Sequence, residues 1–117
     1  MSTPIEVVPF RYNTVAASQT AQKLVRPAAP AATGGQAAGI GQVGDILEEV
    51  VIMPSSVSPG VVSIIDGSTT IFTFAGGTNS LLELRPLVIR VRSRSLNGAW
   101  AITTGASVTV LAYGYFS

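Results

Sequence analysis

The sequence predicts an all-β protein, a β-sandwich or jelly-roll-like domain with an extended N-terminal arm. From residue 44 onward, six or seven short runs rich in β-branched and aromatic residues are separated by turn signals every ~8–12 residues. The best-defined run, Ser107–Phe116, alternates with the period of two that is typical of a strand. One face of this run carries Val108, Val110, Ala112, Gly114 and Phe116, and the other carries Thr109, Leu111, Tyr113 and Tyr115.

The composition indicates a protein that covers part of its surface with partners. Hydrophobic residues make up 47% of the 117 residues and charged residues 11%, whereas soluble domains carry roughly 25% charged residues. A small domain exposes too much surface to stay soluble with so few charges unless a neighbour covers some of it. We therefore expect a homo-oligomer; the alternative is an alanine- and glycine-rich monomer.

Several function classes are excluded by what the sequence lacks. A net charge of +1 favours neither a nucleic-acid nor a membrane partner, and no apolar run reaches the ~18 residues of a membrane span. The first 13 residues, MSTPIEVVPFRYN, lack the basic-then-apolar order of a signal peptide. Cysteine and histidine are absent, which removes disulfides, thiolate metal sites and the commonest general base. We expect no cofactor, no metal and no enzymatic activity.

Residues 1–13 are predicted to form the arm. Pro4 and Pro9 interrupt a short apolar stretch that ends at Phe10, and proline disfavours both helix interiors and central strands. The stretch is too apolar for a merely solvated tail, so we expect it to lie on a neighbouring subunit, with Phe10 in the contact. A frayed terminus is the alternative.

Two segments separate the arm from the regular strands. Thr14–Val25 alternates as a strand does, although its alanines also permit a helix, and we interpret it as an extended, pairing segment. Arg26–Val43 is rich in proline, alanine and glycine without periodicity, which is typical of a long loop. The predicted organisation is therefore an arm and loop over residues 1–43 and a β-sandwich domain over residues 44–117.

From residue 44 the turn residues delimit the strands. The first three predicted strands are Ile46–Met53, which Pro54 ends, Val61–Ile65 and Thr69–Phe74. Asp66-Gly67-Ser68 predicts a hairpin between the second and third, because Asp and Gly tolerate positive φ. Phe72 and Phe74 share a face of the third strand and should enter the core.

The next segment, Leu81–Ser95, is interrupted at Pro86 and is predicted to form two strands or one bent edge strand. Asn97-Gly98 then gives the strongest hairpin signal in the sequence and leads into a strand that contains Trp100 and Ile102.

Three arginines mark the strand before that turn. Arg90, Arg92 and Arg94 alternate with Ile89 and Val91, so the arginines share one face and the apolar side chains the other. A row of guanidinium groups repels itself unless something anionic faces it. The partner is either Glu48 and Glu49, in the same sheet or on a neighbouring subunit, or a phosphate backbone; alternatively the row is a solvated face that protects an edge. We mark the three arginines as candidate subunit-interface residues.

The acidic residues form no catalytic pair. Glu48 and Glu49 are adjacent on a strand and are expected to face opposite ways, so they do not resemble the two carboxylates of a glycoside hydrolase. The remaining acids lie at turns or beside Arg85, where solvation or ion pairing explains them.

Glycines and aromatic residues offer no catalytic or phosphate site either. The pairs Gly34-Gly35 and Gly76-Gly77 do not open a helix and precede no Lys-Ser/Thr, so neither is a phosphate-binding loop. Trp100, Tyr113 and Tyr115 are interpreted as core or interface aromatics in preference to a sugar-stacking platform. Tyr113 and Tyr115 join the candidate interface residues.

Two runs resemble small virion structural proteins of tailed bacteriophages. These runs are SPGVVSIIDGSTTIFTFAGG at Ser58–Gly77 and LRPLVIRVRSRSLNGAWAITTGASVTVLAYGYF at Leu84–Phe116. The shared features are the Ser-Pro-Gly turn, Asp-Gly in a hairpin, Phe-Ala-Gly-Gly, Gly-Ala-Trp followed by Thr-Thr-Gly-Ala, and the aromatic last strand. Ala17–Gln22 resembles the start of such proteins, and the alanine-, proline- and glycine-rich stretch resembles an insertion.

The resemblance implies a β-sandwich subunit of the phage particle, a capsid decoration or cement protein that bridges neighbouring shell subunits and stabilises the head. It implies a homotrimer whose partners are the major capsid protein or other virion proteins, with no membrane partner and no direct nucleic-acid binding. Such a protein is located in the virion and assembled in the host cytoplasm. A tail, neck or fibre component is the alternative within this class, and a carbohydrate-binding module is the alternative outside it.

Overall fold

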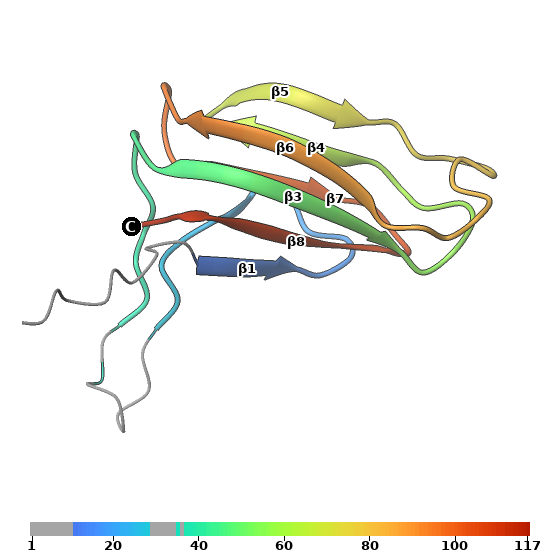
Figure 1. The fold of residues 1–117 in the computed structure, drawn as a ribbon, viewed down its shortest axis with the longest axis horizontal. Helices are drawn as coiled ribbons and strands as arrows, with labels where there is room; N and C mark the ends of the chain where they lie inside the picture. The colour runs from blue at the N-terminus through green and yellow to red at the C-terminus, as the bar shows by residue number, and fades with distance from the viewer. Residues whose placement is uncertain (1–10, 29–34, 36) are drawn as a thin grey trace, which may run out of the picture.

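The computed structural model describes residues 11–28, 35 and 37–117, which form strands, turns and loops without a helix (Figure 1). The strands are β1 Arg11–Val15, β2 Gln22–Lys23, β3 Ile46–Pro54, β4 Val62–Asp66, β5 Thr69–Phe74, β6 Leu87–Arg94, β7 Trp100–Thr104 and β8 Val108–Tyr115. In this described part, no helix long and apolar enough to cross a membrane is present. The prediction of an all-β chain is confirmed.

The strands form two four-stranded antiparallel sheets. Sheet A has the order β1-β8-β3-β6 and sheet B the order β2-β7-β4-β5. Four of the pairs join strands from opposite ends of the chain, in the order β1–β8, β2–β7, β3–β6 and β4–β5. The pairs β3–β8 and β4–β7 complete sheet A and sheet B, respectively. The two sheets lie over one another (Figure 1), which is consistent with a β-sandwich.

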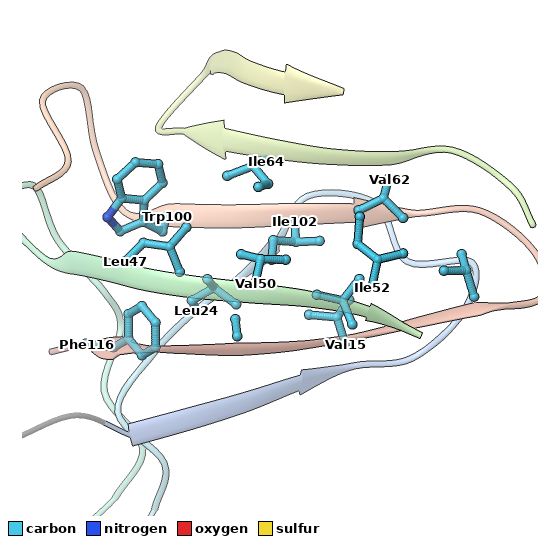
Figure 2. Packing of buried hydrophobic residues seen from close by; sticks show 13 residues of the cluster. Val15, Leu24, Leu47, Val50, Ile52, Val62, Ile64, Trp100, Ile102 and Phe116 are labelled. Atoms are coloured by element: carbon cyan, nitrogen blue, oxygen red, sulfur yellow. The ribbon is translucent and has the colours of Figure 1, made fainter. Parts of the chain in front are cut away.

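The core fills the space between the sheets, as Figure 2 shows. The predicted face of the last strand that runs from Val108 to Phe116 is the buried one. Phe72 and Phe74 pack against this core from β5, as predicted, and Ile89 and Val91 do so from β6. The alternation of apolar residues thus predicted correctly the two faces of β8 and the inward sides of β5 and β6.

The prediction that the arm ends at residue 13 is wrong. Arg11–Asn13 belong to β1, where they pair with Gly114, Tyr113 and Ala112 of β8. Val15 and Leu24 are fully buried, so the sheets and their core extend across the boundary predicted between residues 43 and 44. The rest of the arm, including Phe10, lies outside the described residues. Of Arg26–Val43, the described residues form no strand.

The turn predictions had different outcomes. Gly67 has a φ of 64° in the tight turn that joins β4 to β5, so the Asp-Gly hairpin is confirmed. The Asn97-Gly98 hairpin is wrong, because β6 pairs only with β3 in sheet A while the following β7 lies in sheet B. This connection crosses between sheets, and the Asp66 carboxylate holds it by accepting hydrogen bonds from the backbone nitrogens of Leu96 and Asn97 at 2.9 and 3.0 Å.

The second half of the long arginine-containing segment forms one edge strand, β6, while Leu81–Pro86 forms no strand. The chain therefore has a single edge strand after Pro86, and neither two strands nor one bent strand spans the whole of Leu81–Ser95. From residue 44 onward the chain forms six strands, β3–β8, in agreement with the six or seven predicted there; β1 and β2 precede residue 44.

Candidate interaction surface

The outer face of sheet A, the side away from the core, gathers most of the predicted interface residues. Residues opposite one another in neighbouring strands share a face, so the register defines rows across the sheet. Tyr12 lies opposite Tyr113, which lies opposite Glu49, which lies opposite Arg90. We call this row the polar row; it brings tyrosine from β1 and β8 into line with charges from β3 and β6.

The neighbouring rows differ in chemistry. One step along the strands, Thr14, Leu111, Val51 and Val88 lie opposite one another and form an apolar row. At the other side of the polar row, Tyr115, Ile46 and Arg94 form a third row. The outer face therefore has an apolar end and an end at which tyrosines stand beside charged residues.

A β-bulge places both Glu48 and Glu49 on this face. Leu47 pairs with Gly114 and Glu49 pairs with Tyr113, so Glu48 is an extra residue that has no paired residue in β8. Leu47 and Val50 are both fully buried on the inner side, which leaves the two glutamates between them facing outward. The expectation that adjacent Glu48 and Glu49 face opposite ways is wrong for this reason.

Both glutamates pair with the arginine row. Arg92 Nε lies 3.0 Å from Glu48 Oε1, and Arg90 Nε lies 3.8 Å from Glu49 Oε2. The arginine side chains are 64% and 67% exposed, and the glutamates 32% and 30%. Of the partners left open by the sequence, Glu48 and Glu49 of the same sheet are therefore the ones found. Among the described carboxylates, none lies within ion-pair distance of Arg94.

All three tyrosines of the chain lie on this face. Tyr12, Tyr113 and Tyr115 are 64%, 38% and 46% exposed. Tyr113 and Tyr115 occupy the outward positions that the alternation predicts. Tyr12 was missed because it lies within the residues assigned to the arm; the alternation of Tyr12 and Thr14 with buried Val15 was the available signal.

The remaining candidates do not join this surface. Trp100 is 1% exposed in the core, where its Nε1 donates to the Asp45 carbonyl at 2.8 Å, so it cannot share a sugar-stacking platform with Tyr113 and Tyr115. Phe10 lies outside the described residues. A hollow of about 460 Å³ adjoins the surface at the edge of β1, lined by Arg11, Tyr12, Asn13, Thr14 and Pro27.

The acids elsewhere have structural partners. Asp45 and Asp66 are 3% and 5% exposed and accept hydrogen bonds from backbone nitrogens, and Glu83 pairs with Arg85 at 2.9 Å. Among residues 11–28, 35 and 37–117, no group of three or more acidic residues could hold a metal ion. Tyrosine and arginine are enriched at protein–protein contacts, and the outer face of sheet A carries both kinds of residue.

Comparison with protein families, with curated proteins and with solved structures found no match for this chain.

Proposed function

We propose that this chain is a structural subunit of a tailed-phage virion, a decoration or cement protein that bridges neighbouring shell subunits. The observation that carries the proposal is that most of its exposed large apolar residues, apart from Ile71 in β5 and Val61 before β4, fall into three regions. Tyr12, Val88, Tyr113 and Tyr115 lie on the outer face of sheet A. A protein with one partner needs one such patch, whereas a subunit that bridges several neighbours needs several.

The other two regions lie at opposite ends of the strands (Figure 1). The loop between β5 and β6 exposes Leu82 by 69% and Leu84 by 48%. At the other end, Leu96 follows β6 and is 79% exposed, and Ile40 and Val43 precede β3 and are 80% and 57% exposed. Contacts at both ends and on one face would let a single small domain hold several neighbours together, shell subunits or other copies of the chain.

The strand order supports a jelly-roll topology, which is the finer part of this proposal. In a jelly roll a long antiparallel hairpin is wrapped so that its strands divide between two sheets, and the fold is used by viral capsid domains as well as by lectins and cupins. The pairs β1–β8, β2–β7, β3–β6 and β4–β5 fit such a wrapped hairpin. Because the fold serves other functions too, it supports the virion role without deciding it.

The proposed assembly is a homotrimer that docks on the major capsid protein or on other virion proteins. Burial of apolar surface across several subunits would oppose the outward pressure of packaged DNA. No chemistry is required of the chain: its contribution is the interface area, and stable interfaces bury more than about 1,000 Å².

The test uses virions of the phage that encodes the chain. Heads and tails are separated, and the protein is quantified in each fraction by mass spectrometry. We expect it in the head fraction, in a fixed ratio to the major capsid protein. Virions that lack the gene should lose DNA at a lower temperature, and adding the purified chain back should restore their heat resistance.

Two results would contradict this proposal. Absence of the chain from purified particles would exclude a virion role, and its presence in the tail fraction alone would assign it to the tail, neck or fibre. Replacing Leu82 and Leu84 with serine provides the matched variant: it should bind heads more weakly while its thermal unfolding stays unchanged, because both side chains are exposed.

A further inference from the structure

We infer that the outer face of sheet A binds the same face of a second copy of this chain, related by a two-fold axis that runs along the strands between β8 and β3. This contact goes beyond the virion role and does not rest on it. The observations that carry it are the order of the rows on the face and the division of the polar row between tyrosines, on β1 and β8, and charged residues, on β3 and β6.

The row pattern selects the direction of the axis. A two-fold axis parallel to the strands keeps every row opposite its own row and exchanges β1 with β6 and β8 with β3. The apolar row, which contains Leu111 and Val51, then meets its own copy. An axis across the strands would place the apolar row against the tyrosines and charges, which would leave polar groups desolvated. The two packed sheets would be aligned, as in sheet-on-sheet packing generally.

Within the polar row, the same two-fold rotation places the tyrosines of one copy opposite the charged residues of the other. Tyr12 and Tyr113 of one copy come to lie over Arg90 and Glu49 of the other, and the reverse holds at the symmetric position. Planar guanidinium groups stack on aromatic rings. Each copy carries both the tyrosines and the arginines on this face, so the tyrosines of each copy can stack on the arginines of the other.

The charges of the face permit self-association. The ion pairs of Arg90 with Glu49 and of Arg92 with Glu48 neutralise four of the charges within each copy. Of the five charged side chains on the face, only Arg94 is left without a described carboxylate within ion-pair distance. Two copies therefore approach with little net repulsion, while the arginines, about two-thirds exposed, stay available for stacking.

The size of the face sets the expected strength. Four strands spaced by ~4.8 Å, with up to about nine residues at ~3.3 Å each, cover roughly 500 Å². Two such faces bury about 1,000 Å², the lower limit for a specific interface. We therefore expect a weak association that depends on protein concentration and that single substitutions can abolish.

Sedimentation equilibrium of the purified full chain tests the contact without any virion. The tyrosine variant, Tyr12→Ser with Tyr113→Ser, should have half the mass of the wild-type protein at concentrations at which the wild-type contact is saturated, whatever other oligomeric contacts the chain makes. Ile71→Ser is the matched control, because Ile71 is 48% exposed in β5 of sheet B, away from the face, and this variant should keep the wild-type mass.

A mixing experiment distinguishes this geometry from tyrosine packed on tyrosine. The arginine variant is Arg90→Gln with Arg92→Gln. Each variant alone retains no tyrosine–arginine contact, but a mixed pair retains one, between the tyrosines of the arginine variant and the arginines of the tyrosine variant. A fluorescently labelled tyrosine variant should therefore bind the arginine variant about tenfold more tightly than it binds itself.

A second arginine variant, Arg90→Lys with Arg92→Lys, keeps the pairs with Glu49 and Glu48 and so keeps the fold. It should still associate less tightly than the wild type, because ammonium groups lack the planar stack. Equal masses for the wild type and the tyrosine variant would overturn the inference and leave the face to a different protein. Half the mass without recovery on mixing would overturn the two-fold axis along the strands.

Discussion

A single buried carboxylate, Asp45, connects Ser117 to the start of β3. Its Oδ2 accepts hydrogen bonds from the backbone nitrogens of Gln42 and Ser117, each at 3.1 Å, and its Oδ1 accepts from the Ser117 hydroxyl at 2.9 Å. Its carbonyl accepts from Trp100 Nε1 and from Ser95 N, both at 2.8 Å. One residue thus joins Gln42, Ser95 and Ser117 to the largest core side chain.

Replacing Asp45 with alanine should lower the free energy of unfolding by about 2–4 kcal/mol, because each donor left without a partner away from water costs about 1–3 kcal/mol. Urea unfolding followed by circular dichroism measures the change. Glu83→Ala is the control: Glu83 is 71% exposed in its pair with Arg85, and its loss should change stability by at most ~0.5 kcal/mol. Equal losses in both variants would contradict the role given to Asp45.

The Arg92–Glu48 pair gives a second prediction for single residues. Arg92→Glu should lower stability by about 0.5–1 kcal/mol at low salt, since it sets like charges side by side on one face. The exchanged double variant, Glu48→Arg with Arg92→Glu, should recover most of this loss. Thermal melts at low and high salt provide the measurement. A loss that is the same at 1 M salt would show that shape, and not charge, decides this position.

Among the elements, β8 places the tightest constraint on the sequence, because it lies between β1 and β3 in sheet A. Gly114 has no space for a side chain: a Cβ there would overlap the Ile46 carbonyl and lie 2.8 Å from the Phe116 ring. The positive-φ glycines of the chain do not include Gly114. Its glycine is therefore required by crowding next to the bulge of β3.

Gly114→Ala should lower the free energy of unfolding by about 3 kcal/mol, the upper range for overpacking a filled site. Gly77→Ala separates crowding from backbone strain, since Gly77 has open space around it but a φ of 99°. That control should lose only about 1 kcal/mol. Chemical denaturation of both variants decides the point; a larger loss at Gly77 would show that backbone conformation matters more than crowding.

What the sequence could predict depended on whether the signal was local. The two faces of the last strand and the Asp66-Gly67 hairpin follow from period-two alternation and from turn residues, and both were correct. Asn97-Gly98 has equally good turn chemistry, but turn chemistry does not reveal which sheet the next strand joins. That choice depends on Asp66, some 30 residues earlier, whose carboxylate holds the crossing chain.

The candidate surface was likewise predictable where its signals were local. Alternation placed the arginines and two tyrosines on outward faces, and the glutamates were named as possible partners. The bulge at Glu48 was not predictable, because it is defined by the pairing of β3 with β8 and with β6, which lie far away in the sequence. Tyr12 was missed since Pro9 and the neighbouring apolar residues indicated an arm, whereas pairing with β8, about 100 residues later, makes it part of a strand.

At the scale of the whole molecule, the two ends of the described chain depend on one another. β1 and β8 are adjacent in sheet A although most of the sequence lies between them, and the pairs β2–β7 and β3–β6 repeat this arrangement inward. The core closes only when distant segments have met. Folds dominated by such pairings fold slowly, in milliseconds to seconds, so strand loss at either end should affect the entire domain.

Truncation tests this dependence. Removing residues 1–10 should leave the thermal unfolding temperature nearly unchanged, because β1 and its register with β8 remain. Removing residues 1–15 deletes β1 and Val15, which is fully buried. The loss of that side chain costs about 1.5–3 kcal/mol, and the lost strand pairing adds about 0.5–1.5 kcal/mol for each hydrogen bond. Together these approach the 5–15 kcal/mol that stabilise an ordinary domain.

The longer truncation also uncovers the edge of β8, an uncharged strand rich in β-branched and aromatic residues, and such edges aggregate. We therefore expect the protein lacking residues 1–15 to be largely unfolded or aggregated at 25 °C, and the protein lacking residues 1–10 to remain folded. Circular dichroism melts and size-exclusion chromatography of the two proteins provide the comparison. Equal melting temperatures would mean that β1 adds little to the sheet, and unfolding of both would place residues 1–10 in the stabilising structure.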